Sequence, residues 1–335
     1  MDRETPFGEH GPSSERSGGH VTDLLADLNP QQRAAVTASD GPVLVLAGPG
    51  SGKTRVLTRR VAWLVQERAV PPHRIMAVTF TNKAAREMRG RLQSLLGHAR
   101  TTGLTLGTFH ATCARILRRE GAALDIPRDY AIFDADDQIA LVRRILRDLD
   151  IDDKKYRPAA VHALISRAKN ELIPPEAYRP DSYFTEIVHR VYEVYQQRLR
   201  ENGALDFDDL IMETVRLFHE FPAVLERYQE RYLHVLVDEF QDTNMAQYVL
   251  LRHLTARHRN LFAVADEDQS IYRWRGADYR NIARLREDYP DLVTYLLEQN
   301  YRSTQTILDV AQAIIRRNPD RTEKRLFTRR GKGLK

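Results

Sequence analysis

Residues 42–57 read Pro-Val-Leu-Val-Leu-Ala-Gly-Pro-Gly-Ser-Gly-Lys-Thr-Arg-Val-Leu: a short apolar run, a glycine-rich turn and the start of a helical pattern. The near-continuous apolar run is typical of a strand in a parallel sheet that is covered on both faces. Glycines after such a strand allow backbone N–H groups to turn inward around phosphate oxygens, and the dipole of the following helix favours the negative charge. This order of strand, loop and helix predicts a phosphate-binding loop rather than an ordinary glycine-rich turn.

Two side chains at the end of this loop suit a bound nucleotide. Lys53 would reach the β- and γ-phosphates, and the Thr54 hydroxyl would ligate Mg²⁺. The first position of the pattern is Ala47 in place of the usual glycine, and a small residue suffices there. The loop positions expected to bind the nucleotide are Ala47, Gly48, Pro49, Gly50, Ser51, Gly52, Lys53 and Thr54. Such a loop by itself does not distinguish a kinase, a switch GTPase and a motor.

Apolar runs of the same kind recur along the chain and alternate with helical patterns. The strand candidates are residues 42–47, 75–80, 104–109, 235–237, 261–265 and 292–297. Residues 54–68 and 83–96 carry apolar side chains at helical spacing, with charged side chains on the other face. This alternation predicts an α/β fold with a doubly wound parallel sheet. Residues 119–204 interrupt it with a charged, helical pattern punctuated by prolines, so we expect an inserted all-helical subdomain there.

A second acidic site follows the apolar run at 235–237. Asp238 could hold Mg²⁺ through water, and Glu239 could polarise an attacking water. Because adjacent residues of a strand point to opposite sides, both can serve only if Glu239 lies in the turn just past the strand end. The pair favours hydrolysis by water over transfer to a substrate, which argues against a kinase. The alternative is two acids that solvate the end of a strand.

A third polar stretch, residues 266–275, follows another apolar run. Gln269 could sense the γ-phosphate by hydrogen bonding. Tyr272 and Trp274 are two residues apart and flanked by arginines, so an extended chain would present both rings on one face. Aromatic rings interleaved with Arg suit stacking on unpaired bases, with phosphate contacts alongside. The alternative is a Tyr and a Trp packed in the core.

Asp206, Asp208 and Asp209 form an acidic cluster before a helical run. The cluster could be a metal site, but an Asp in this position is more often an N-cap, and we favour the cap. His110 has no second ligand-spaced histidine nearby, so we do not expect it to bind a metal.

The composition suits a globular protein of about two domains. The chain has 335 residues, of which 42% are hydrophobic and 29% charged, and no apolar run reaches the roughly 18 residues that a membrane span needs. The single cysteine, Cys113, is expected to be buried and excludes both a disulfide framework and a Cys-based metal site, which suits a reducing compartment. The net charge of +5 is concentrated in residues 316–335, so it does not argue for nucleic-acid binding by the whole chain.

With these motifs in order along the chain, the sequence resembles the superfamily 1A DNA helicases of the UvrD, Rep and PcrA type, in their N-terminal portion. The resemblance runs from about residue 24 to the C-terminus. The matching segments are the Q motif at residues 28–32, motif I at 52–55, motif Ia at 80–85, motif Ib at 108–110, motif II at 238–243, motif III at 268–278 and motif IV at 299–303.

The resemblance implies roles for further residues. Gln32 would read the adenine edge, Arg55 would lie near the nucleotide, Tyr301 would stack on the adenine, and Arg302 would contact the γ-phosphate. Lys53, Glu239, Gln269 and Arg302 would form the catalytic set with MgATP. The residues that would contact single-stranded DNA are Phe80, Thr81, Asn82, Lys83, Thr108, Phe109, His110, Tyr272, Trp274 and Arg275.

The resemblance also implies a division of the chain. Residues 1–23, rich in Gly, Ser and charge, are expected to be a disordered leader. Residues 24–118 and 205–290 would form a P-loop, RecA-like motor domain, with 119–204 as its insertion. Residues 291–335 would begin a second RecA-like domain, truncated before motifs V and VI.

The resemblance implies an ATP- and Mg²⁺-dependent translocase or helicase that moves 3′ to 5′ on single-stranded DNA. The chain would be an N-terminal fragment of it that lacks motifs V and VI, and we expect this fragment to be weakly active or inactive by itself. Its expected partners are single-stranded DNA, junctions of single- and double-stranded DNA, the remainder of the second motor domain, and repair or replication proteins. The expected location is the cytoplasm, on the nucleoid, with no membrane contact. Two alternatives stay open: a nucleotide- or DNA-binding module without turnover, and the motor part of a helicase–nuclease repair subunit.

Overall fold

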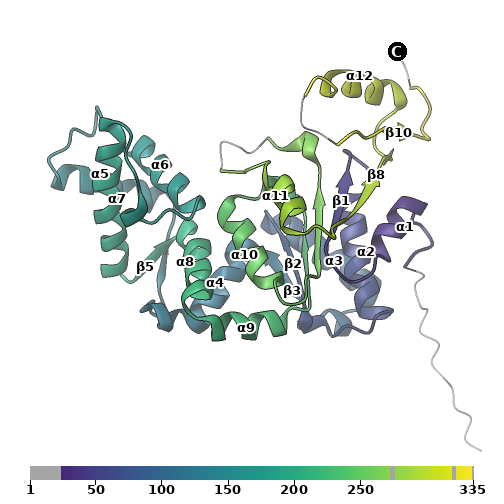
Figure 1. Ribbon diagram of the computed structural model, residues 1–335, viewed down its shortest axis with the longest axis horizontal. Helices are drawn as coiled ribbons and strands as arrows, with labels where there is room; N and C mark the ends of the chain where they lie inside the picture. Colours follow the sequence, from purple (N-terminus) through teal and green to yellow (C-terminus); the bar gives the residue numbers. More distant parts are fainter. Residues whose placement is uncertain (1–23, 272–275, 319–321, 334–335) are drawn as a thin grey trace, which may run out of the picture.

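Six parallel strands form the centre of the molecule in a computed structural model, which describes residues 24–271, 276–318 and 322–333 (Figure 1). The strand order in this sheet is β3-β2-β6-β7-β1-β8. The strands are β1 (Val43–Ala47), β2 (Ile75–Thr79), β3 (Thr105–Thr108), β6 (His234–Val237), β7 (Leu261–Ala265) and β8 (Val293–Leu297). All six predicted strands are confirmed, and each pairing between neighbours is parallel.

Alternating side chains of β1 enter two separate hydrophobic cores. Leu44 and Leu46 belong to one core, whereas Val43, Val45 and Ala47 belong to the other, and all five are buried. A strand that is apolar at every position is therefore explained by a sheet covered on both faces. The doubly wound α/β prediction is confirmed.

Helices on the two faces supply the rest of these cores. One face is covered by α1 (Pro30–Val36), α2 (Lys53–Gln66) and α3 (Asn82–Leu96). The other is covered by α4 (Phe109–Glu120), α8 (Phe207–Glu220), α9 (Pro222–Arg231), α10 (Met245–Thr255) and α11 (Asn281–Asp288). Cys113, in α4, is fully buried as predicted. Among the described residues, no helix is long and apolar enough to cross a membrane.

The inserted segment forms a body with its own core at one end of the molecule (Figure 1, left). Its helices are α5 (Ala135–Asp148), α6 (Pro158–Asn170) and α7 (Tyr183–Glu201). The prediction of an all-helical insertion is wrong in one respect, because β4 (Ala131–Phe133) pairs in parallel with β5 (Ala204–Asp206). A strand of three residues is too short to show an alternating pattern, and its pairing partner lies more than 70 residues away in the sequence.

The predicted start of a second domain at residue 291 precedes β8, and β8 pairs with β1 in the main sheet. The sheet of the first domain thus continues to Leu297, and we infer that any domain boundary follows it. Beyond it lie β9 (Gln299–Asn300), α12 (Gln305–Ile315) and β10 (Phe327–Thr328), of which β9 and β10 pair in parallel. The predicted disordered leader, residues 1–23, lies outside the described residues.

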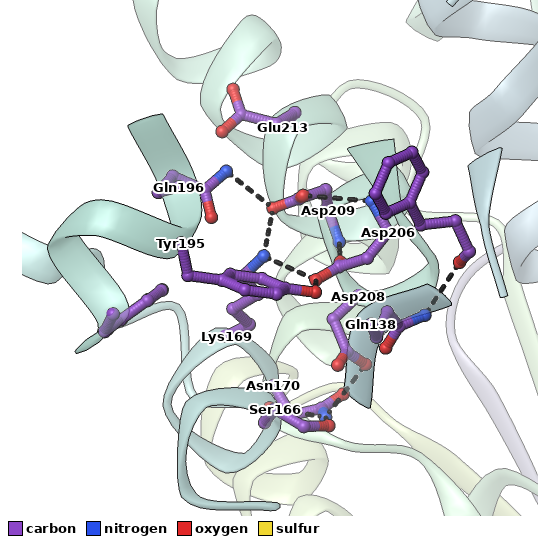
Figure 2. A network of polar contacts seen from close by, with 12 residues as sticks. Gln138, Ser166, Lys169, Asn170, Tyr195, Gln196, Asp206, Asp208, Asp209 and Glu213 are labelled. Atoms are coloured by element: carbon purple, nitrogen blue, oxygen red, sulfur yellow. Dashed lines mark hydrogen bonds and ion pairs between the residues drawn. The ribbon is translucent and has the colours of Figure 1, made fainter. Parts of the chain in front are cut away.

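A buried ionic network fastens the insertion to the main domain (Figure 2). Lys169 of α6 is fully buried, and its Nζ lies 2.7 Å from Asp206 Oδ2 and 2.8 Å from Asp209 Oδ1. Asp206 is the N-cap of α8, with Asp209 completing the capping box, so the predicted cap is confirmed. The Tyr195 hydroxyl and the Gln196 amide donate to the same two carboxylates at 2.9 and 3.1 Å. No group of three or more His, Cys, Asp or Glu side chains that could hold a metal ion occurs in the described part of the chain.

The charges in this network determine its protonation. Burial lowers the pKa of Lys169, but Asp206 and Asp209 raise it more, so the ammonium stays charged. Burial and the neighbouring Asp206 raise the pKa of Asp209 to about 7. Lys169 is therefore the cation on which both buried carboxylates depend.

Replacing Lys169 by methionine should lower the free energy of unfolding by about 3–5 kcal/mol, because two buried carboxylates lose their cation. Urea denaturation measures the loss, and the exposed Lys154→Met is the matched control. The loss should be smaller at pH 5 than at pH 8, since Asp209, whose pKa is raised, is protonated at the lower pH and then needs no cation. An unchanged urea midpoint at pH 8 would contradict this account.

Candidate functional site

The phosphate-binding loop, the end of β6 and the end of β7 meet at one edge of the main sheet. In the sheet β1 lies next to β7, and β7 lies next to β6, so the loops that follow these strands are neighbours. The carboxyl edge of a parallel sheet is where ligands bind in doubly wound folds. Three of the motifs predicted to act on a nucleotide are thus brought together from positions far apart in the sequence.

The loop before α2 has the backbone of a phosphate cradle. Gly50 and Gly52 have φ of 65° and 89°, in the left-handed region that favours glycine, and Gly52 is the N-cap of α2. A Cβ atom at Gly52 would lie 2.8 Å from Gln32 Nε2. Gln32 is fully buried and donates this amide to Ser51 O at 2.8 Å, while its Oε1 accepts from the Asn29 N–H at 3.2 Å. In this structure Gln32 therefore links the loop to the start of α1, with one end of its amide on each.

Lys53, the first residue of α2, points to two carboxylates. Its Nζ lies 3.3 Å from Asp266 Oδ2 and 3.5 Å from Glu239 Oε2, and its side chain is 10% exposed. Arg55, two residues further along the helix, pairs at 3.6 Å with Asp27 and is more exposed. The lysine thus lies at the end of the phosphate-binding loop, and its charge is balanced by the carboxylates that follow β7 and β6.

Thr54 and Asp238 form a pair of oxygen ligands. The Thr54 hydroxyl lies 3.5 Å from Asp238 Oδ2. Burial, together with the adjacent Glu239 carboxylate, raises the pKa of Asp238 to about 6. The carboxylate is therefore mostly ionised at pH 7. A hydroxyl and a carboxylate side by side are the hard oxygen donors that Mg²⁺ prefers, so these residues fit the predicted magnesium site.

Glu239 lies in the turn just past β6, as the two-acid pattern required. β6 ends at Val237, and Glu239 has a left-handed backbone, with φ of 51°, before the short 3-10 helix Phe240–Asp242. Such a backbone is uncommon for a residue with a side chain and is often found at functional sites. Gln241 Nε2 donates to Glu239 Oε2 at 2.9 Å, and Gln241 Oε1 accepts the Asp266 N–H at 2.9 Å. Gln241 thus links the loops after β6 and β7.

Gln269 ends the 3-10 helix Glu267–Gln269 after β7, and its amide donates to Asp266 Oδ2. The sequence predictions missed both Asp266 and Gln241. Asp266 follows β7 directly, as Asp238 follows β6, and this parallel could have identified it. Gln241 carries no comparable signal, because its role depends on two loops being adjacent.

A groove of about 1660 Å³ separates this edge from the inserted helix α6. Thr54, Asp238, Glu239 and Gln269 line it together with three residues predicted to bind DNA, namely Phe80, Thr81 and His110. Thr81 caps α3, so Asn82 and Lys83 are exposed in the first turn of that helix. Four of the predicted nucleotide-site residues and three of the predicted DNA contacts therefore line one groove.

Two of the residues predicted to contact DNA are buried and do not line the groove. Phe109 is 1% exposed and packs in the core, with its ring centroid 5.6 Å from that of Phe80. Its side chain has no free face for a base, so it supports Phe80 instead. Thr108 is buried and caps α4 through the Ala111 N–H. Phe109 begins α4 on the side of the helix that packs in the core, whereas the next residue, His110, lines the groove.

His110 is the member of this segment that lines the groove. Burial lowers its pKa, so the imidazole is neutral at pH 7. Its ring meets that of Phe207 edge-on, with centroids 6.0 Å apart. Tyr272, Trp274 and Arg275 lie outside the described residues, and their predicted roles stay predictions.

Tyr301 and Arg302 lie against the phosphate-binding loop. The Tyr301 N–H donates to Gly50 O at 2.9 Å, and its hydroxyl accepts from Asn29 Nδ2 at 2.9 Å. A Cβ atom at Gly50 would be 2.7 Å from Arg302 Cβ, so only glycine fits there. Both side chains are exposed. The structure thus brings motif IV to the loop, as the predicted nucleotide contacts require.

Comparisons with known proteins agree with this geometry. Residues 28–290 match the family described as the UvrD/REP helicase N-terminal domain. The chain is 49% identical over 314 residues to the ATP-dependent DNA helicase PcrA of Bacillus subtilis, 48% identical over 315 residues to that of Leuconostoc citreum, and 47% identical over 314 residues to that of Staphylococcus aureus. Each comparison covers 93% of this chain but only 42–43% of the relative, so the chain spans less than half the length of these proteins.

Proposed function

The chain belongs to the UvrD/REP helicase N-terminal domain family, and from this premise we propose that it forms the ATP-binding and single-strand-binding part of an ATP-dependent DNA helicase. The observation that carries the proposal is the groove in which Glu239 and Gln269 lie beside Phe80 and His110. A nucleotide bound at the phosphate-binding loop and a DNA strand bound in the groove would then contact the same short segments of the chain.

The residues at the loop suit MgATP. The N–H groups around Gly50 and Gly52 and the Lys53 ammonium would hold the phosphates, and Thr54 with Asp238 would hold Mg²⁺. Bound Mg²⁺ would neutralise charge on the phosphate oxygens. Tyr301 and Arg302 would contact the nucleotide from the other side of the loop, in accordance with their position at Gly50.

Glu239 is the proposed general base. Its side chain lines the groove and is 39% exposed, and the Gln241 amide donates a hydrogen bond to its carboxylate. Such a group can accept a proton from a water that lies between it and the phosphate. Gln269 would report the state of the phosphate site to the groove, because its amide already contacts Asp266 beside Lys53.

We infer the remaining features from the family resemblance alone. They are movement in the 3′ to 5′ direction, action at junctions of single- and double-stranded DNA, and work on the nucleoid with repair or replication proteins. We propose DNA unwinding only for a protein that is as long as the relatives.

The first test is equilibrium binding by the wild-type chain. A fluorescent ATP analogue with Mg²⁺ and a labelled oligothymidine should both bind, and a duplex of the same length should compete less well than the single strand. Aromatic stacking needs unpaired bases, which explains the expected preference. Absence of nucleotide binding, or equal competition by duplex, would count against the proposed function.

A further inference from the structure

A second lysine reaches the nucleotide edge from the last described segment of the chain. Lys324 is fully buried, and its Nζ lies 3.3 Å from Asp266 Oδ1 and 3.3 Å from Asp268 Oδ2. A buried ammonium is tolerated only where it is paired. None of the predicted nucleotide or DNA contacts includes this residue.

Asp266 joins the two lysines. Its Oδ2 accepts from Lys53 Nζ and from the Gln269 amide, whereas its Oδ1 accepts from Lys324 Nζ and from the Asp268 N–H. The carboxylate is fully buried. Its ion pairs within the described residues are with Lys53 on one oxygen and Lys324 on the other.

The segment around Lys324 is held by contacts that do not involve its charge. Leu326 is buried against the phosphate-binding loop, since a Cβ atom at Gly48 would lie 2.3 Å from Leu326 Cδ2. Gln312 Nε2 donates to Leu326 O at 2.8 Å, and the Phe327 N–H donates to Glu298 O at 3.2 Å. The segment therefore has other anchors, and the charge of Lys324 is available for a different role.

We propose that Lys324 is a positioning residue of the nucleotide site, which acts through Asp266 to release Lys53 for the phosphates. This inference rests on the proposed function. When Lys53 turns to a phosphate, it leaves a buried carboxylate that must keep a cation, and Lys324 supplies that cation. Without Lys324, Asp266 competes with the phosphate for Lys53, because Lys53 is then its remaining ion-pair partner among the described residues.

The test is a double-mutant cycle on nucleotide affinity. Lys324→Met should weaken binding of the fluorescent ATP analogue with Mg²⁺ by about tenfold, within the range of coupling between contacting residues. Lys324→Arg should restore most of the affinity, because it restores the cation. The double variant Asp266→Asn/Lys324→Met should bind more tightly than Lys324→Met alone, since the competing carboxylate is gone. If the role is only structural, removing Asp266 as well restores no affinity, and this outcome would overturn the proposal.

A second readout needs no nucleotide. In urea denaturation, the midpoint of the double variant should fall by less than the sum of the two single shifts, because each single variant already breaks the pair. Arg325→Met, an exposed neighbour in the same segment, should leave both affinity and midpoint unchanged. Absence of nucleotide binding by the wild type would remove the proposed function, and the positioning role with it, whereas additive urea shifts in a chain that binds ATP would overturn the positioning role alone.

Discussion

Replacing Lys53 by alanine should raise the dissociation constant for MgATP by at least about a hundredfold. The side chain is 10% exposed, so it meets a phosphate largely shielded from water. Removing one member of such a charge pair costs roughly 3 kcal/mol or more, and each 1.4 kcal/mol corresponds to about tenfold in affinity. Titration of the chain with a fluorescent ATP analogue, read by anisotropy in the presence of Mg²⁺, measures the change.

The control for this variant is Lys154→Ala, which removes an exposed lysine of the insertion. It should bind MgATP as the wild type does. The Lys53 variant should also keep its fold, because Asp266 retains Lys324 as a cation. Circular dichroism and a urea midpoint check that point. A folded Lys53→Ala chain with unchanged affinity would mean that the loop after β1 does not hold the nucleotide phosphates.

Replacing Glu239 by glutamine should slow ATP hydrolysis by about 10²–10⁴-fold, the usual contribution of a positioned general base. The amide has the shape of the carboxylate and can still accept the hydrogen bond from Gln241, so the left-handed turn should persist. What is lost is the ability to accept a proton. Single-turnover hydrolysis, with the chain in excess over labelled ATP, detects even slow rates and separates chemistry from product release.

The same chemical change at Glu171 is the matched control. Glu171 is exposed, lines the same groove and pairs at 3.0 Å with Arg167, away from Lys53. Glu171→Gln should leave the rate unchanged, and Glu239→Gln should bind MgATP within about threefold of the wild type. Equal hydrolysis by wild type and Glu239→Gln would remove the residue from the chemistry and favour a binding module.

Much of the site could be predicted because its signals are local in sequence. The apolar runs at β1, β2 and β7 carry the burial pattern of a covered parallel sheet in five consecutive residues each. The glycine spacing before Lys53 predicts the backbone that the loop needs. Two adjacent acids can face one ligand only if Glu239 lies in the turn past the strand, where the structure places it. The cap at Asp206 follows from the preference of Asp for helix starts.

The features that the sequence did not reveal depend on pairs of residues that are distant along the chain. β8 lies beside β1 because a crossover of more than 200 residues returns to the same sheet, and no local pattern specifies that neighbour. The burial of Phe109 depends on the phase in which α4 packs on the sheet, which a single residue next to a strand end does not show.

The pairing of buried charges is the clearest case of a feature that the sequence did not reveal. Asp206, Asp209 and Asp266 can be recognised as acids after strands or before a helix, but their cations, Lys169 and Lys324, are 37 or more residues away. Backbone preferences and hydrophobic periodicity act over a few residues, so the strands, the loop and the caps could be predicted from the sequence. A buried charge is stable only beside its partner in space, so the tertiary structure alone decided which lysine serves which carboxylate, and with it how the nucleotide edge is balanced.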